Sequence, residues 1–332
     1  MFSLLSLWAQ ALCAYTQETG YVQWLLFHPL EHGHGEAVAR TVVEGLFGDS
    51  VLRQVAYTHG VRYRFQRRGQ WVCLEGEATP EGLFTLFHVL RGAIQRFPQR
   101  LQQNAIPIAE SPPELNRGFQ IAYEDTLPVD LSPLALTQYF TRYWQAGGVR
   151  GVLRGKIPTP LLHLAQEIAA GGVSELYWPP QPPPALSSPA HQGPGVVYIR
   201  WQLSGSPSLA VWAALWQQAD ALLHYLCAER QIACQAQWVP FMKGVELWIE
   251  TGLPYATQQA AQDFLSRPFC PSPQRLPAFF TWLHRAENFL LAGWWACLWQ
   301  IPQLPTAIPT LSAKELQRAA RGWQLIIHTW NL

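Results

Sequence analysis

The sequence is poor in charge and lacks the short motifs that mark several enzyme classes. Only 14% of its 332 residues are charged, whereas about 25% is typical of soluble domains. The formal net charge is +1, so no electrostatic feature favours nucleic-acid binding. The patterns G-x-x-x-x-G-K-[ST], G-x-G-x-x-G and G-x-S-x-G are all missing. These absences remove the support for nucleotide-dependent and serine-hydrolase chemistry.

The cysteines form no C-x-x-C pair and no regular framework. The six lie at positions 13, 73, 227, 234, 270 and 297. Scattered thiols in a long chain are typical of a reducing compartment. We therefore expect a cytoplasmic protein.

The sequence also lacks a recognisable targeting segment and a long hydrophobic run. Residues 1–14 are apolar and contain no basic n-region, and we expect a buried helix rather than a signal peptide. The apolar run 288–301 covers 14 residues and ends before Pro302. This length is short for a membrane span and suits a core helix. We expect no membrane span.

Apolar and aromatic residues, by contrast, are abundant. Hydrophobic residues make up 49% of the chain, and 16 residues are Trp. One interpretation is a large, Trp-rich core. The other is a surface partly covered by a partner, because interface centres are depleted of charge and enriched in aromatic residues. We favour the second interpretation.

A Pro-rich stretch divides the chain into two halves of similar size. Seven prolines fall between Pro179 and Pro194. Proline fixes φ and has no N–H, so this stretch cannot join a helix or a central strand. It is typical of an extended spacer, and a chain of 332 residues suits two domains.

In the first half, strand and helix signals follow in a clear order. Aromatic and aliphatic residues predict a strand over 21–28, and helical spacing predicts a helix from Glu36 to Gly48. Two strands are expected within 62–78, and Thr79-Pro80 opens a helix with an N-cap Thr and a first-turn Pro. The remaining expected elements are loops and short helices over 98–131, a helix over 132–144, a strand over 149–157 and a helix over 160–170.

The second half repeats this order. After a strand over 196–203, a helix opened by Ser206-Pro207 is predicted to reach Leu226, and two strands lie within 233–250. Leu253-Pro254 then opens a helix, as Thr79-Pro80 does. The last expected elements are a long helix over 276–299, a helix that starts with the capping box Ser312–Glu315 and reaches Trp323, and a strand over 324–330.

The repeated order indicates an internal duplication. Antiparallel strand pairs with helices between them predict an α+β fold. We expect two tandem, structurally similar domains, each a mainly antiparallel sheet packed with helices. The predicted boundaries are 1–172 for the N-terminal domain, 173–195 for the Pro-rich linker and 196–332 for the C-terminal domain.

Three stretches carry the patterns of one known family. Residues 35–48 are similar to G-x-x-H-x-x-E-H-x-x-x-F-x-G, and residues 131–155 to an L-[ST]-x-x-x-[LV] helix followed by a V-x-G strand. Residues 311–325 are similar to a closing L-[ST]-x-x-[DE]-[LV]-x-x-[AV]-A helix. With these patterns, most of the chain resembles a two-domain half of a pitrilysin/insulinase-type metallopeptidase, the family of the mitochondrial processing peptidase.

The resemblance implies that this chain has lost the family's reactive residues. Family members hold zinc by His ligands one turn apart, with Glu between them as general base. The matching positions here are Arg40, Val43 and Glu44, and an Arg cation cannot hold Zn²⁺. The family's L-R-E-x-x-G-x-A-Y segment, whose Arg and Tyr hold the substrate backbone, matches residues 226–234. Cys227 or Ala228 stands at the Arg position, and Cys234 replaces the Tyr.

A literal inverted zinc motif does occur elsewhere, in the order His28, Pro29, Leu30, Glu31 and His32. Its spacing suits two ligands and a base, provided that both His residues lie on one helical face. However, His28 ends a predicted strand, and two glycines follow His32. The candidates for a third ligand are Glu110 and Glu114, and His34 is a further residue that could bind a metal adventitiously.

We therefore expect a non-catalytic, metallopeptidase-like subunit that has no cofactor of its own. The resemblance implies a homologous, zinc-bearing peptidase subunit as its partner in a heterodimer, with a peptide or precursor protein enclosed between them. Two alternatives stay open: an active zinc peptidase that uses His28, Glu31 and His32, and a purely structural subunit like the core subunits of respiratory cytochrome bc complexes.

Overall fold

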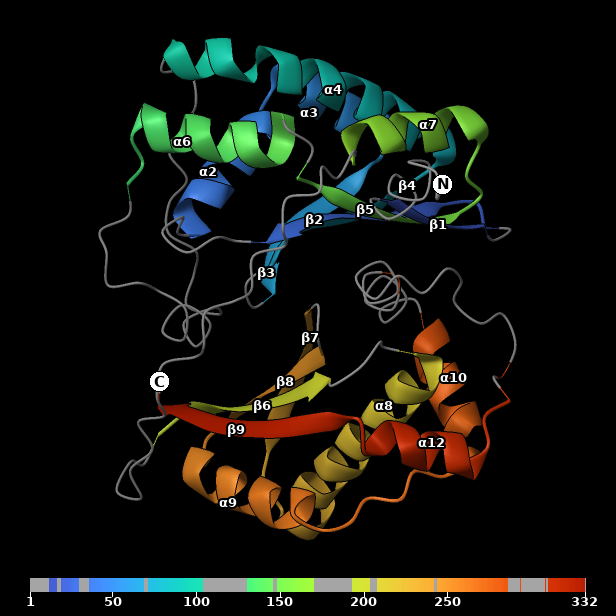
Figure 1. Ribbon diagram of the computed structural model, residues 1–332. Helices are drawn as coiled ribbons and strands as arrows, with labels where there is room; N and C mark the ends of the chain where they lie inside the picture. The colour runs from blue at the N-terminus through green and yellow to red at the C-terminus, as the bar shows by residue number, and fades with distance from the viewer. Residues whose placement is uncertain are drawn as a thin grey trace, which may run out of the picture. The chain divides into compact units, whose positions relative to one another are not determined.

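The computed structural model describes residues 12–16, 19–29, 36–68, 71–103, 130–145, 148–169, 193–203, 208–241, 244–285 and 310–331, together with Gly293 and Ile308. These residues form two compact units, one within 12–169 and the other within 193–331. Each unit is a mainly antiparallel sheet packed with helices (Figure 1), as the sequence predicts. The predicted linker lies almost entirely outside the described residues, so its boundaries stay a prediction.

The first unit contains a five-stranded sheet in the order β1-β5-β2-β4-β3. Strand β2 lies between β4 and β5 and is antiparallel to both, whereas β1 joins β5 in parallel. The strands are β1 (Leu12–Thr16), β2 (Val22–Pro29), β3 (Arg62–Arg68), β4 (Trp71–Ala78) and β5 (Arg150–Gly155).

The second unit contains a four-stranded, fully antiparallel sheet in the order β7-β8-β6-β9. Its strands are β6 (Gly195–Leu203), β7 (Cys234–Phe241), β8 (Gly244–Thr251) and β9 (Trp323–Asn331). Read from the other end, this spatial order is β9-β6-β8-β7, which matches the order β5-β2-β4-β3 in the first sheet. The sheets therefore share one strand order, and β1 is the addition in the first.

Strand register confirms the correspondence between the sheets. Val22 at the start of β2 pairs with Ala78 at the end of β4, and Gly195 at the start of β6 pairs with Thr251 at the end of β8. The helix that follows has Pro80 at its first position in one unit and Pro254 in the other. These prolines occupy equivalent points, as the duplication hypothesis requires.

Helices cover one face of the first sheet (Figure 1). The longest, α4, starts where Thr79 Oγ1 accepts the N–H of Gly82, as predicted. In the core, Trp24 of β2 meets Phe87 of α4 edge-on with ring centroids 5.6 Å apart. The helices are α2 (Glu36–Phe47), α3 (Ser50–Thr58), α4 (Pro80–Gln102), α6 (Pro133–Phe140), which continues as the π-helical turn η2 (Thr141–Gln145), and α7 (Thr159–Ile168).

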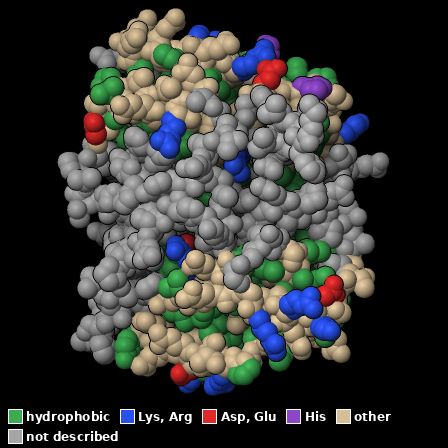
Figure 2. Space-filling model, viewed as in Figure 1, with side chains coloured by type: hydrophobic (Ala, Val, Ile, Leu, Met, Phe, Trp, Pro, Cys, Tyr) green, Lys and Arg blue, Asp and Glu red, His purple; other side chains and the backbone are tan. Residues whose placement is uncertain are grey.

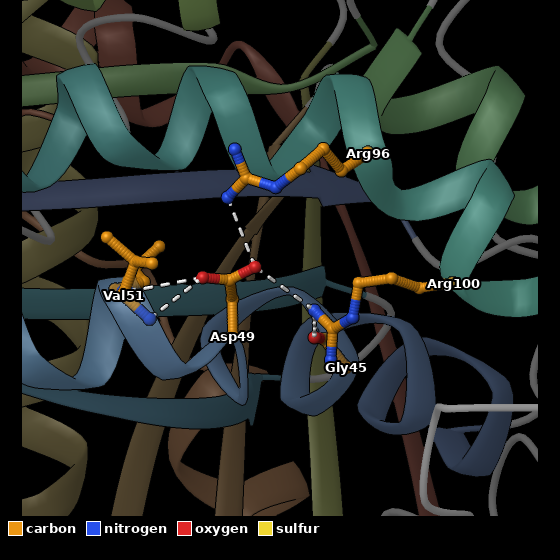
Figure 3. Close-up of polar contacts among 6 residues, drawn as sticks. Gly45, Asp49, Val51, Arg96 and Arg100 are labelled. Carbon is orange, nitrogen blue, oxygen red and sulfur yellow. Dashed lines mark hydrogen bonds and ion pairs between the residues drawn. The ribbon is translucent and has the colours of Figure 1, made fainter.

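Asp49 joins three of these helices (Figure 3). Its carboxylate caps α3 by accepting the N–H groups of Val51 at 3.0 Å and Leu52 at 3.4 Å. The same side chain accepts from Arg96 of α4 at 3.1 Å and lies 3.6 Å from Arg100. Arg100 also donates to the carbonyl of Gly45 in α2. This cluster fixes α2 and α3 against α4.

The second unit packs its helices around α8, which is buried on nearly all sides. Its Trp212 meets Phe279 of α10 with ring centroids 5.8 Å apart. The predicted capping box is present at α12, where Ser312 and Glu315 bond reciprocally. The helices are α8 (Leu209–His224), which continues as the π-helical turn η3 (Tyr225–Glu229), α9 (Pro254–Leu265), the short η4 (Pro273–Arg275), α10 (Leu276–His284) and α12 (Ala313–Ala320).

Several predicted elements were wrong in the first unit. Residues 12–16 form strand β1 rather than the end of a helix, because pairing with β5 decides the structure of this short apolar segment. Helix α4 continues through Pro98 to Gln102. The cost of about 3 kcal/mol for an internal Pro is offset by the burial of Phe97 and Leu101 on either side of it.

In the second unit the errors concern helix ends. Helix α10 ends at His284 because Arg285 takes extended backbone angles, although the apolar pattern continues in the sequence. Helix α8 is capped by Ser208 rather than opened at Ser206, and α12 ends at Ala320. None of the described helices combines the length and the apolar character that crossing a membrane requires.

Candidate functional site

Helix α2 separates a buried apolar face from a polar one. Val42, Val43 and Leu46 are buried in the core, so Val43 supplies no exposed group. Arg40 and Glu44 lie one turn apart with side chains 18% and 45% exposed, and they form an ion pair at 3.6 Å. The helix thus presents charges of opposite sign at the positions that the resemblance assigns to zinc ligands.

The Arg40 side chain also contacts the neighbouring edge of the sheet. Its Cζ atom lies 4.9 Å from the ring centroid of Phe65 in β3, which is a cation–π distance. A fixed guanidinium beside Glu44 opposes metal binding, because it neutralises the carboxylate and places positive charge where Zn²⁺ would sit. Among the residues that the structure describes, no three His, Cys, Asp or Glu side chains come together as a metal site.

His28, the first residue of the literal inverted motif, lies in a strand. It is 1% exposed and pairs with Val72 across β2 and β4. Its Nε2 is 2.9 Å from the hydroxyl of Tyr139, and its ring stacks on Tyr143 with centroids 4.3 Å apart. These contacts account for His28 as a hydrogen-bonded core residue. The other residues proposed for this site, Glu31, His32, His34, Glu110 and Glu114, lie outside the described part of the chain.

In the second unit, Cys227 and Cys234 come together across one turn. Cys227 is exposed in η3, and Cys234 is half-buried as the first residue of β7. Their sulfur atoms are 3.5 Å apart, which is a hydrogen-bond distance for thiols. Burial and the contact with Cys227 raise the pKa of the Cys234 thiol to about 12. Ala228, the other candidate for the Arg position, is exposed.

The turn between the cysteines contains a left-handed residue. Gln231 has φ +55° and is the one non-glycine residue with positive φ in the described part of the chain. This conformation favours glycine, and the L-R-E-x-x-G-x-A-Y pattern has its Gly at the same point when Cys234 is placed on the Tyr. That register puts Cys227 on the Arg position.

Sequence reasoning missed a buried ionic cluster in the second sheet. Glu246 of β8 accepts hydrogen bonds from the hydroxyl of Tyr198 at 2.6 Å and from Arg200 at 2.6 and 3.0 Å. The indole N–H of Trp248 donates to it at 3.2 Å. The available signal was a Glu within the otherwise apolar stretch G-V-E-L-W-I. Paired in this way across adjacent strands, these residues form part of the core rather than an open site.

Comparison with known proteins shows the fold through structure alone. No family model and no curated protein sequence matches the chain. The inactive domain of an M16 peptidase from Pseudomonas fluorescens matches with a TM-score of 0.56 at 13% identity, over 96% of this chain and 94% of that one. A putative M16-like peptidase from Alicyclobacillus acidocaldarius matches with a TM-score of 0.54 at 10% identity, over 96% of each chain.

A chain of Complex III2 from Candida albicans also matches, with a TM-score of 0.54 at 12% identity, over 96% of this chain and 93% of that one. The chain spans only 43% of the periplasmic protease PqqL from Escherichia coli, at 13% identity and a TM-score of 0.48. The two matches to M16-type peptidases with TM-scores of 0.56 and 0.54 show that the protein has their fold. This confirms the α+β fold and the resemblance to the pitrilysin type that the sequence predicts.

Proposed function

We propose that this chain is a non-catalytic, metallopeptidase-like subunit that pairs with a zinc-bearing homologue. The pair would enclose a peptide or precursor protein, and zinc would belong to the partner alone. The fold is shared with an inactive M16 peptidase domain, which supports a role without catalysis. The low charge and 16 Trp of the sequence support a surface covered by a partner.

The observation that carries this proposal is the polar face of α2. An ion pair between Arg40 and Glu44, with Arg40 also over Phe65, occupies the assigned ligand positions. Helix α2 contains no His or Cys, so a shift of the alignment by one or two residues places no His ligand within the helix. This supports a metal that is held by another chain.

Sheet edges offer a way to hold an extended peptide. Strand β3 lies at the end of the first described sheet and β7 at the end of the second. A strand at such an edge can pair with a peptide through main-chain hydrogen bonds. Because Phe65 of β3 contacts Arg40, the β3 edge adjoins the polar face of α2. A peptide bound there would lie beside the Arg40–Glu44 ion pair instead of a catalytic metal.

Co-expression with a homologue that keeps an intact H-x-x-E-H motif tests the proposal. We expect a one-to-one complex by native mass spectrometry, peptide cleavage only by that complex, and zinc only in the homologue. Replacing the motif Glu of the homologue by Gln should abolish cleavage. The matched change in this chain, Glu44→Gln, should leave zinc content and the chemical step unchanged. A homologue that is fully active without this chain would contradict the proposal.

Metal analysis of the isolated chain tests the alternative that the chain is itself an active zinc peptidase. We expect no stoichiometric zinc and no peptide cleavage. The variant His32→Ala is more informative than a change at His28, because His28 is buried against Tyr139 and Tyr143. One zinc per chain that His32→Ala removes would overturn our proposal and restore the peptidase hypothesis.

The second candidate function is a purely structural subunit. The match to a chain of Complex III2 is the observation that favours it. Such a subunit would co-purify with a larger membrane complex and would bind no peptide. Affinity purification of the intact chain from its own cell extract, followed by identification of its partners, separates the two functions.

A further inference from the structure

The turn between η3 and β7 holds two thiols at fixed positions. Backbone hydrogen bonds link Arg230 to Tyr225 at 3.0 Å and Ile232 to Leu226 at 2.9 Å. The Arg230 side chain adds a bond of 2.6 Å to the hydroxyl of Tyr225. These contacts place the sulfur atoms of Cys227 and Cys234 within 3.5 Å without a covalent bond.

The two sulfur atoms are close enough to form a disulfide after a small movement. A disulfide needs an S–S separation of about 2.0 Å, so the atoms must approach by about 1.5 Å. Cys227 is exposed and lies at the end of a helix rather than in the core. Its side chain can therefore rotate toward Cys234 while the sheet stays in place.

We propose that Cys227 and Cys234 form a redox-active dithiol that oxidises reversibly to an intramolecular disulfide. The oxidant is a low-molecular-weight disulfide such as glutathione disulfide. The proposal is independent of the function proposed above, because it needs only the intact chain and a thiol–disulfide couple.

The two cysteines have different parts in this exchange. The exposed Cys227 thiol loses its proton to water, and the resulting thiolate attacks one sulfur of glutathione disulfide, which forms a mixed disulfide and releases one glutathione thiolate that takes up a proton from water. The Cys234 thiol then loses its proton to water and attacks the Cys227 sulfur, which releases the second glutathione. Two protein thiols are oxidised, and one glutathione disulfide is reduced to two thiols.

The environment of Cys234 favours this order of attack. Its raised pKa, about 12, is caused by burial and by the Cys227 sulfur, so Cys234 is a poor first nucleophile. Once the Cys227 sulfur is in a mixed disulfide, its thiol no longer interacts with Cys234, and the part of the raised pKa of Cys234 that this interaction causes is removed. Burial remains, and the resolving step becomes easier.

The test equilibrates the full chain in glutathione buffers of increasing oxidised fraction, quenches exchange with acid, unfolds the chain in denaturant, blocks free thiols with excess iodoacetamide at alkaline pH and maps the labelled peptides. We expect labelling of Cys227 and Cys234 to be lost together, with a cross-linked peptide that loses two hydrogens, and to return after dithiothreitol. Cys234→Ser should stop at a glutathione adduct on Cys227. Cys227→Ser should leave Cys234 labelled. Cys270→Ser, which removes another exposed thiol, is the matched control and should change nothing.

Three outcomes would overturn the proposal. The first is full labelling of both cysteines at every glutathione ratio. The second is a disulfide that joins either cysteine to Cys270 or to a second chain. The third is an adduct on Cys227 that accumulates equally in the wild type and in Cys234→Ser, since Cys234 would then not resolve it. Because the wild-type map alone reveals the first two outcomes, a variant that fails to fold leaves the proposal falsifiable.

Discussion

The charge of Asp49 stabilises the helices that it joins. Burial raises its pKa, but hydrogen bonds from Arg96 and from the N–H groups of Leu52 and Val51 outweigh burial and lower it. A depressed folded-state pKa adds stability above the unfolded value of about 3.9, and that stability is lost as pH falls through the folded value. Asn caps a helix about as well as Asp, so Asp49→Asn isolates the charge.

We expect Asp49→Asn to lower the free energy of unfolding by about 1 kcal/mol at neutral pH. The difference from wild type should shrink to near zero below the folded-state pKa. Urea unfolding at several pH values measures both effects. Asp220→Asn is the control, because Asp220 pairs with Arg275 while both side chains are more than 40% exposed, and it should cost less than about 0.5 kcal/mol. An Asp49→Asn effect independent of pH would contradict the assignment to charge.

Replacing Glu246 is expected to lower the free energy of unfolding more than replacing a charged residue on the surface. In Glu246→Gln, Arg200 keeps its buried position but no longer faces the carboxylate charge of Glu246, and breaking a buried pair costs about 3–5 kcal/mol. The matched control is Glu75→Gln in the first unit, because Glu75 is buried but its partner Arg64 is 67% exposed. Solvent can rehydrate Arg64, so the control should cost clearly less. Equal losses in denaturant unfolding would show that burial of the arginine is not the cause.

At the scale of elements, the N-cap of α4 gives a direct test of a local signal. Thr79→Ala removes the hydroxyl that accepts the Gly82 N–H, and we expect a loss of about 1 kcal/mol in the free energy of unfolding. Thr79→Ser keeps the hydroxyl and should restore most of that loss. Thermal or denaturant unfolding of the three proteins decides the point. A Ser variant as unstable as the Ala variant would assign the effect to the lost methyl group.

Elements with strong local signals could be predicted from the sequence. Strand composition and capping residues correctly predict four features. These are strand β2, the β3–β4 pair, the N-cap Thr79 and the capping box at Ser312. Helix α3 has no separate signal in the sequence, because Gly48 indicates only the end of α2, whereas Asp49 caps a new helix at once. Strand β1 was missed because its structure depends on pairing with the distant β5.

The candidate site divides in the same way. The positions of Arg40 and Glu44 follow from a pattern along one helix, because residues four apart share a face. Arg40 contacts Phe65 between a helix and a strand, and the network around Glu246 joins two strands. These residues are far apart in the sequence, so no local pattern could predict that they come together. The positive φ of Gln231 could not be predicted from its residue type, because glutamine does not favour that conformation.

At the scale of the whole molecule, the chain should unfold in more than one step. The first unit has a core made only of residues from its own part of the chain, and the two units divide as separate compact bodies. We therefore expect a calorimetric enthalpy larger than the van't Hoff enthalpy. In Glu246→Gln, hydrogen exchange should accelerate within 193–331 and stay unchanged within 12–169. A single transition that shifts as one would show strong coupling between the units.

The surface of the described residues fits a molecule that uses few charges. On the face shown in Figure 2, Lys, Arg, Asp and Glu side chains are scattered singly or in small groups. Tyr57 and Leu134 are among the large apolar side chains that are exposed. A partner would cover such residues at a stable interface, which buries at least about 1,200 Å² in total.

The division of α2 into two faces has an evolutionary consequence. Val42, Val43 and Leu46 fill the core, so their replacement would cost folding stability. Arg40 and Glu44 lie on the other face as an ion pair, and their replacement would change the local charge while the core stays as it is. The two sets of positions can therefore diverge independently within one helix while the sheet-and-helix architecture is kept.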